Sequence, residues 1–214
     1  MLWGDTMIIG AVSDIGLRIE NNQDSMFTSE LEDLPLFIVA DGMGGHQAGD
    51  IASTMAVNGI IDYFKEKQEF LNSEDNIKQI IKEAISNVNE MIYKKSLEIS
   101  EFAGMGTTVT LAYIYNSNIY IGHVGDSRAY IIRNKTITQL TEDHSLMNEL
   151  IKCGTITPDE ALTHPQRNMI TRAAGTSYSI KMDYFTVNYE YADVLILCSD
   201  GLTNMVDESL ILEE

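Results

Sequence analysis

Four aspartates are the residues of this sequence best suited to chemistry: Asp41, Asp126 and Asp200 follow candidate strands, and Asp24 ends the polar stretch before Ser25-Met26-Phe27. Three of the four are next to a glycine. If these strands share a sheet or barrel, their ends would bring the carboxylates to one edge of it. Carboxylates brought together repel one another, and burial adds to that cost unless they are protonated or paired with cations.

Divalent cations with oxygen ligands would relieve this repulsion. Of the four aspartates, only Asp126 has a basic near neighbour, Arg128. Glycine also lets a backbone carbonyl approach an ion, which favours Asp41-Gly42 as a metal-binding strand end. Asp-Gly is equally a common turn pair, so spacing alone leaves a turn and a metal ligand both open.

The composition excludes several classes of function. The 214 residues carry a net charge of −18 and are 44% hydrophobic, which suits one soluble globular domain. That charge opposes binding to nucleic acid and to anionic membranes. No apolar run is long enough to span a bilayer, and the first residues do not resemble a secretory signal. We expect a monomeric, cytoplasmic protein with no nucleic-acid or membrane partner.

Other catalytic motifs fail at defined positions. The glycines of residues 44–49 resemble a phosphate-binding loop, but Asp50-Ile51 stands where lysine and serine or threonine are required. Cys198 is not followed by the arginine of a thiolate phosphatase loop, and the sequence contains no Gly-x-Ser-x-Gly motif.

Apolar periodicity predicts the elements that must position the aspartates. Strand-like runs lie at 36–40, within 107–140 and at 192–198. Helical spacing predicts a helix over 50–66, capped by Asp50, and a longer helix capped by Ser73. The connections within 107–140 are so short that neighbouring strands must be antiparallel. Residues 145–175 are irregular and resemble an excursion from the sheet.

Seven stretches resemble, in order, the motifs of the metal-dependent protein phosphatases of the protein phosphatase 2C type, and together they span most of residues 8–212. They are SDIGLRIENNQDS, VADGMGGHQAGDIAS, GMGTTVT, GHVGDSRAY, LTEDHSL, ITRAAGT and LCSDGLTNMV. The form DGMGGH resembles the bacterial branch of that family.

This resemblance implies an α/β protein of the α+β type, a four-layer sandwich of two antiparallel sheets flanked by helices. It implies one catalytic domain over residues 1–214, with residues 145–175 as a flap beside the active site. The implied activity is hydrolysis of phosphoserine and phosphothreonine in proteins, which a bacterial serine/threonine kinase would phosphorylate. The alternatives are a phosphatase-like module that binds phosphoproteins without turnover, and a hydrolase of small phosphate esters.

The resemblance also assigns roles to individual residues around two Mn²⁺ or Mg²⁺ ions. Asp41 resembles the carboxylate that bridges both ions, Gly42 a carbonyl ligand, and Asp200 a ligand to one ion. Asp24 corresponds to an acidic residue that contacts the ions directly or through water, and Asp126 to the position of a weaker third ion. Asp24, Asp41 and Asp200 are therefore the expected catalytic residues. A water activated by the two ions would attack phosphorus in line with the leaving group.

The sequence departs from the family pattern in two places. The family usually has a phosphate-binding arginine where this chain has Ile19, and Arg18 stands one residue earlier. Arg18 is the candidate substrate-binding residue, although adjacent side chains of an extended segment point to opposite faces. The family also continues to an Asp-Asn pair on a final strand, beyond Glu214 of this sequence. We therefore expect one metal site to be weakened and the sheet to lack a strand.

Two histidines receive structural roles. His144, in the run TEDHS, is expected to fix the base of the flap by hydrogen bonds rather than to perform chemistry. His123 lies within a predicted strand, and we interpret it as a packing residue.

Overall fold

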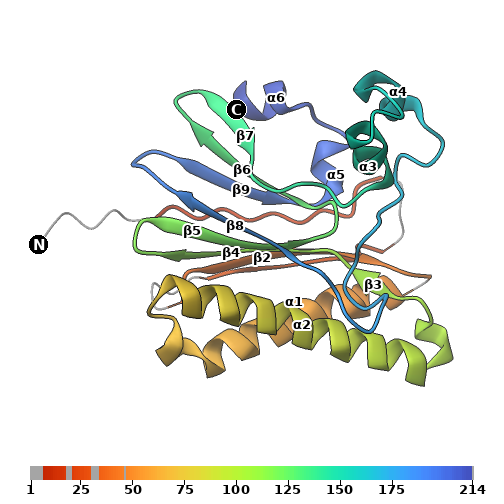
Figure 1. Cartoon of the computed structure of the whole chain (residues 1–214), viewed down its shortest axis with the longest axis horizontal. Coiled ribbons are helices and arrows are strands. Elements are labelled where there is room, and N and C mark those ends of the chain that lie inside the picture. Colours follow the sequence, from red (N-terminus) through yellow and green to blue (C-terminus); the bar gives the residue numbers. More distant parts are fainter. Residues whose placement is uncertain (1–6, 18–20, 30–33, 46, 214) are drawn as a thin grey trace, which may run out of the picture.

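The structure contains two antiparallel sheets packed face to face, with two long helices on the outer face of the larger sheet (Figure 1). It is a computed structural model that describes residues 7–17, 21–29, 34–45 and 47–213. The predicted α/β architecture of two antiparallel sheets flanked by helices is therefore confirmed.

The larger sheet has the strand order β1-β2-β4-β5-β8, and β3 pairs with the end of β2. All of its pairings are antiparallel. Its strands are β1 (Asp24–Thr28), β2 (Leu36–Met43), β3 (Gly106–Thr107), β4 (Val109–Tyr115), β5 (Asn118–Val124) and β8 (Asp183–Asn188).

The smaller sheet has the order β7-β6-β9 and carries its own core where it faces the larger sheet. Its strands are β6 (Arg128–Arg133), β7 (Thr136–Gln139) and β9 (Val194–Cys198). The short helices are α3 (Leu146–Lys152), α4 (Pro158–Thr163), α5 (Asp200–Thr203) and α6 (Glu208–Glu213), with one-turn 3₁₀ helices at Gln68–Phe70 and Ser100–Phe102.

Buried and half-buried residues alternate along β2, and this alternation shows which of its side chains face the helices. Leu36, Ile38 and Ala40 are buried in the core beneath the helices, and the residues between them are half-buried. Successive side chains of a strand point to opposite faces, so the half-buried set, which includes Asp41, faces the smaller sheet. The strand also runs on to Met43, beyond the predicted end at residue 40.

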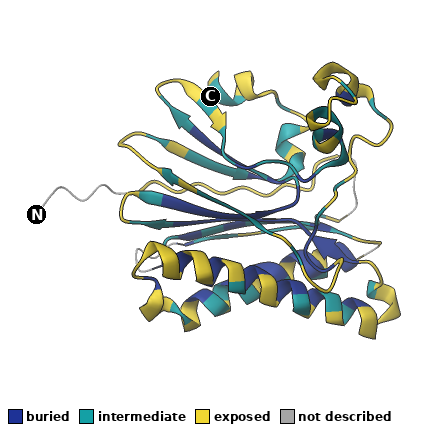
Figure 2. Ribbon diagram, in the orientation of Figure 1, coloured by how far each residue is buried: buried dark blue, intermediate teal, exposed yellow. Residues whose placement is uncertain are grey.

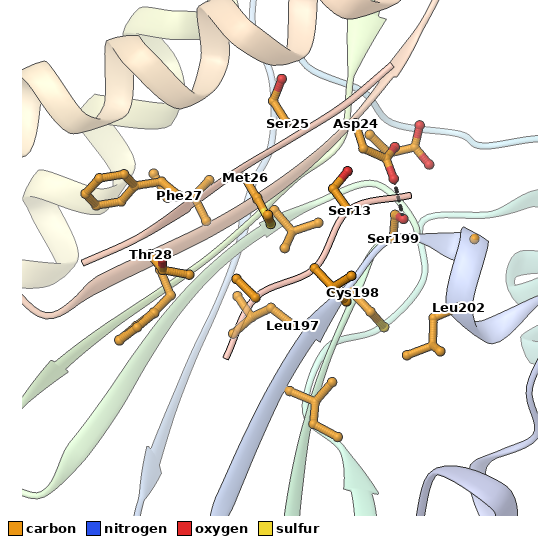
Figure 3. Close-up of a pocket in the computed structure, with 18 of the residues that line it drawn as sticks. Ser13, Asp24, Ser25, Met26, Phe27, Thr28, Leu197, Cys198, Ser199 and Leu202 are labelled. Atoms are coloured by element: carbon orange, nitrogen blue, oxygen red, sulfur yellow. Dashed lines mark hydrogen bonds between the residues drawn. The ribbon is translucent and has the colours of Figure 1, made fainter. Parts of the chain in front are cut away.

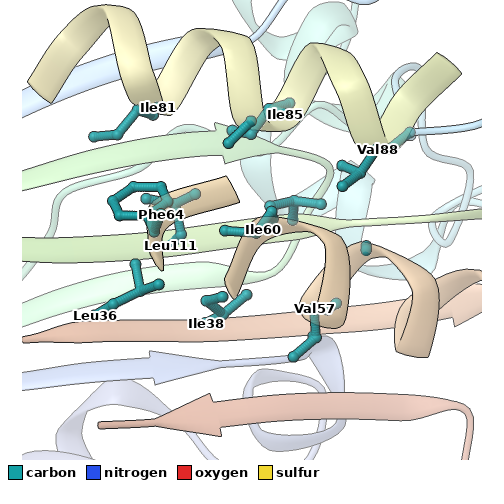
Figure 4. Packing of buried hydrophobic residues seen from close by; sticks show 14 of the residues in the cluster. Leu36, Ile38, Val57, Ile60, Phe64, Ile81, Ile85, Val88 and Leu111 are labelled. Carbon is teal, nitrogen blue, oxygen red and sulfur yellow. The ribbon is translucent and has the colours of Figure 1, made fainter. Parts of the chain in front are cut away.

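The helices α1 (Ala48–Glu66) and α2 (Glu74–Glu98) turn their buried residues toward the larger sheet (Figure 2). Ile60 and Phe64 of α1 meet Ile81 and Ile85 of α2 in that core (Figure 4). Ser73 caps α2 as predicted, since its hydroxyl accepts a hydrogen bond from the backbone N–H of Asn76.

The start of α1 differs from the prediction. Its N-cap is Gln47, and Asp50 lies in the first turn instead of capping the helix. A carboxylate in the first turn still stabilises the helix through its interaction with the macrodipole. For this reason the start predicted from Asp50 lies close to the observed start of α1.

Residues 145–175 leave the smaller sheet and carry α3 and α4. A β-bridge between Ser145 and Ile170 closes the base of this segment, and the backbone N–H of Leu146 donates to the carbonyl of Met169. Within the described ranges, no helix has the length and apolar character needed to cross a membrane.

We predict that Ile81→Ala lowers the free energy of unfolding by about 2–5 kcal/mol, because this fully buried side chain fills the space between α2 and the sheet. Urea unfolding followed by circular dichroism measures the change. The exposed neighbour Lys82→Ala should change it by less than about 0.5 kcal/mol. Equal effects of the two substitutions would show that this core is not the one that stabilises the fold.

Candidate metal and active site

Asp24 and Asp41 are direct cross-strand partners at the end of β1 and β2. Ser25 contacts the hydroxyl of Ser53 on α1, so the adjacent Asp24 points to the opposite face of the sheet. That face is the one toward the smaller sheet, where Asp41 also lies. Like charges directly opposite each other destabilise a strand pair, so this pairing calls for a compensating interaction.

The end of β9 brings Asp200 to the same place. Ser199 is the N-cap of α5, yet its hydroxyl makes no cap bond and donates to Asp24 Oδ2 at 2.7 Å (Figure 3). Asp200 is the first residue of α5, and its Oδ2 accepts from Nδ2 of Asn204 at 2.9 Å. Asp24, Asp41 and Asp200 line one end of a groove of about 2260 Å³ between the two sheets.

Asp126 reaches the cluster from the turn between β5 and β6. Gly125 makes this turn with a φ of +110°, a conformation that disfavours other residues. A Cβ on Gly125 would lie 2.5 Å from Cγ2 of Thr108, so the turn also needs glycine for close packing.

The electrostatics confirm that the four carboxylates are neighbours. Burial is the largest cause that raises the pKa of Asp41, to about 8, followed by the charges of Asp24, Asp200 and Asp126. Asp41 also shares a hydrogen bond with the side chain of Asp200. Burial and then the charge of Asp200 raise the pKa of Asp126 to about 6. The prediction that the aspartates gather at one edge is confirmed.

Arg128, the basic near neighbour of Asp126 in the sequence, does not pair with the aspartate cluster. Its guanidinium binds Asp143 through Nε at 2.9 Å and Nη2 at 2.6 Å, and Nη1 donates to the hydroxyl of Tyr130. Its charge lowers the pKa of Asp126 only as a minor contribution. Asp126 thus keeps a raised pKa although an arginine lies two residues away.

Gly42 is required by close packing of backbone. A Cβ there would lie 2.0 Å from the carbonyl oxygen of Gly49 in α1 and 2.7 Å from that of Gln23. The N–H of Gly42 donates to the same Gln23 carbonyl at 3.1 Å. Glycine therefore lets α1 begin directly against β2, next to Asp41.

The donor set suits hard divalent cations, which prefer carboxylate and carbonyl oxygens together with water. In the part of the chain that the structure describes, no three acidic, histidine or cysteine side chains are arranged to hold an ion by themselves. The carboxylates adjoin Asp41 without closing around a common point. Backbone carbonyls or water would have to complete the coordination, which is usual for Mg²⁺.

His144 joins the Asp126 turn to Asp183 at the start of β8. Its Nδ1 accepts from the N–H of Gly125 at 3.0 Å, so Nε2 carries the proton and donates to Asp183 at 3.1 Å. Burial lowers the pKa of His144, so it remains neutral near pH 7. The predicted structural role of His144 agrees with these bonds. The ring of the fully buried His123 packs against it at a tilt of 40°, with 4.8 Å between the ring centroids.

Sequence reasoning missed Asp183 and Ser199. Asp183 begins β8 and also binds Arg172 at 3.0 Å, and no spacing in the sequence relates these residues to His144. Ser199 directly precedes Asp200, and a serine at this position of a helix usually caps it through its side chain. In the structure its hydroxyl donates to Asp24 instead, which the sequence pattern does not indicate. Arg18 and Ile19 lie outside the described residues.

Comparison with known proteins shows the family of the chain. Residues 18–213 match the family model for Protein phosphatase 2C. The chain is 43% identical over 198 residues to the serine/threonine phosphatase stp of Listeria welshimeri, covering 92% of this chain and 78% of that protein. It is 41% identical over 207 residues to protein phosphatase PhpP of Streptococcus pneumoniae, covering 96% and 82%.

Solved structures show the same fold. The S. agalactiae serine/threonine phosphatase is similar with a TM-score of 0.87 and 40% identity, covering 94% of this chain and 83% of that one. The catalytic domain of the serine threonine protein phosphatase PstP, solved in complex with 2 manganese ions, has a TM-score of 0.80 and 31% identity, covering 94% and 81%. The chain belongs to the protein phosphatase 2C family and is a serine/threonine protein phosphatase.

Proposed function

We propose that Asp24, Asp41, Asp126, Asp200 and the carbonyl of Gly42 hold two divalent cations, Mn²⁺ or Mg²⁺, for hydrolysis of phosphoserine and phosphothreonine in proteins. The pairing of Asp24 with Asp41 across β1 and β2, with Asp126 and Asp200 beside them, is the observation that carries this proposal, and this crowding raises the pKa of Asp41. A carboxyl that is buried beside three others stays protonated near neutral pH unless cations replace the proton. The relative solved with 2 manganese ions supports the same chemistry.

In this proposal each carboxylate has a different role. Asp41 lies among the other three and is the one suited to bridge two ions, while Asp200 and Asp24 would each serve from one side. Ser199 fixes the orientation of Asp24 by donating to one of its oxygens. Asp126, on the β5–β6 turn, would hold a weaker third ion.

When bound, such ions would supply charge that neutralises the phosphate and a water acidic enough to attack it near neutral pH. The acidic residues alone would repel a phosphate dianion, so binding of the phosphorylated substrate would also depend on cations in the site. Asp24, Asp41 and Asp200 all line the groove between the sheets, so a phosphorylated side chain that enters this groove would meet them.

We also propose that the chain is a single catalytic domain with residues 145–175 as the flap beside the site. Lys152 and Arg172 in this segment pair with Glu142 and Asp183, so they hold the flap base. Arg18, which precedes β1, is proposed to bind the substrate phosphate. The substrates would be the products of a serine/threonine kinase, the class of reaction that makes this phosphomonoester.

We predict that Asp41→Asn lowers metal-dependent hydrolysis of a phosphothreonine peptide by at least ~100-fold, because the variant loses the bridging carboxylate. Steady-state phosphate release with saturating Mn²⁺ measures this loss, and circular dichroism checks the fold. Asp62→Asn, on the exposed face of α1, is the matched control and should retain activity. Full activity of the Asp41 variant, or wild-type activity that survives chelation, would contradict the proposal.

A second prediction concerns the stability of the metal-free protein. The pKa of Asp41 rises from 3.8 to about 8 on folding, so folding favours the protonated form. Its contribution to stability is complete below about pH 4 and is lost as the pH rises through 8. Asp41→Asn removes this loss of stability. In the presence of a chelator at pH 8.5, the free energy of unfolding of the variant should exceed that of wild type by on the order of 1–3 kcal/mol.

Urea unfolding of both proteins between pH 5 and pH 8.5 provides the comparison. The stability advantage of the asparagine variant should grow with pH up to about 8, because the wild-type carboxyl is ionised in the unfolded state while it keeps its proton in the folded state. A constant difference would mean that Asp41 is already ionised at pH 5 and that the carboxylates are not close together in solution.

A further inference from the structure

Two buried hydroxyl groups lie directly behind the carboxylate cluster. Thr108, between β3 and β4, is 2% exposed, and Ser127, directly before β6, is fully buried. Their hydroxyl oxygens are 2.7 Å apart, although the residues come from different parts of the sheet system. Buried hydroxyls of this kind are retained where they satisfy polar groups that would otherwise be unpaired.

Thr108 holds the backbone of Asp41. The N–H of Thr108 donates to the Asp41 carbonyl at 2.8 Å, as in a regular antiparallel pair. In the return bond, the N–H of Asp41 donates to Oγ1 of Thr108 at 2.8 Å instead of to its carbonyl. The carbonyl of Thr108 accepts from the hydroxyl of Thr107. A side chain thus replaces a main-chain acceptor at the residue that carries the central carboxylate.

The same threonine holds the turn that carries Asp126. Its hydroxyl binds Ser127, and its methyl carbon occupies the space where a Cβ of Gly125 would lie, at 2.5 Å. Thr108 therefore contacts the residues on both sides of Asp126. His144 holds Gly125 from the other side through two hydrogen bonds, which leaves the turn little freedom to move.

We propose that Thr108 and Ser127 are positioning residues that fix the separation of the Asp41 and Asp126 carboxylates and thereby set the affinity of the site for divalent cations. This inference rests on the metal site proposed above. Asp41 and Asp126 repel each other, and the Thr108–Ser127 pair connects their backbones at the point where that repulsion acts. Both hydroxyls act through other residues, since each is engaged with the protein behind the cluster.

The test compares Thr108→Val with Thr108→Ser in the full chain. Valine keeps the shape of threonine and removes the hydroxyl, whereas serine keeps the hydroxyl and removes the methyl group. Free Mn²⁺ is measured by electron paramagnetic resonance during titration, and kcat and KM are measured on a phosphothreonine peptide. Thr108→Val should bind Mn²⁺ about 10-fold or more weakly, and its kcat should fall more than its KM changes.

Thr108→Ser should retain Mn²⁺ affinity within about threefold of wild type, because the hydroxyl supplies the contact to Asp41 and Ser127. Ser96→Ala is the matched control, since it removes a buried hydroxyl bond within α2, at 2.7 Å to the carbonyl of Tyr93. That variant should lose stability without a change in Mn²⁺ binding.

Wild-type Mn²⁺ affinity in Thr108→Val, or an equal loss in Thr108→Ser, would overturn the inference. If Thr108→Val does not fold, Ser127→Ala decides in its place, because it leaves the bond between Asp41 and Thr108 intact. Weaker Mn²⁺ binding by Ser127→Ala would support the inference, and unchanged binding would refute it. Failure of the wild-type protein to bind Mn²⁺ would instead reject the metal site itself.

Discussion

The repulsion between buried carboxylates is the constraint on which the rest of this structure depends. Asp24 and Asp41 face each other across a strand pair, and Asp126 and Asp200 approach them from two other elements. Burial and the neighbouring carboxylates raise the pKa of Asp41 to about 8, so without cations the fold favours a proton on this carboxyl. A protein gains nothing in stability from such a cluster. The presence of the cluster in the groove is explained by a function that requires divalent cations.

The scaffold holds the carboxylates against this repulsion from three directions. The alternation of β2 anchors Leu36 and Ile38 in the helical core, which leaves Asp41 on the opposite face. The close contact of Gly42 with α1 prevents the end of β2 from moving away. The bonds of Ser199, Thr108 and His144 then fix the neighbouring aspartates by backbone and side chain. Preorganisation of this kind is what a site for transition-state charge requires.

Much of this could be predicted from the sequence, and the failures have physical causes. The helix capped by Ser73, the antiparallel strands of 107–140 and the gathering of the aspartates follow from periodicity and short connections. Strand β1 escaped prediction because its five residues begin with Asp24 and gain their order from pairing with β2. Strand β8 is equally dependent on β5. The ion pair between Arg128 and Asp143 is a tertiary contact, and no local sequence pattern indicates it.

Manganese bound in crystals of the protein offers the most direct measurement of the central claim. Anomalous scattering near the manganese absorption edge locates each ion independently of the protein model. The account predicts peaks within bonding distance of carboxylate oxygens of Asp41 and Asp200, about 2.0–2.3 Å for such hard oxygen ligands. An absence of peaks at these oxygens at saturating Mn²⁺, or ions bound only elsewhere on the acidic surface, would contradict it.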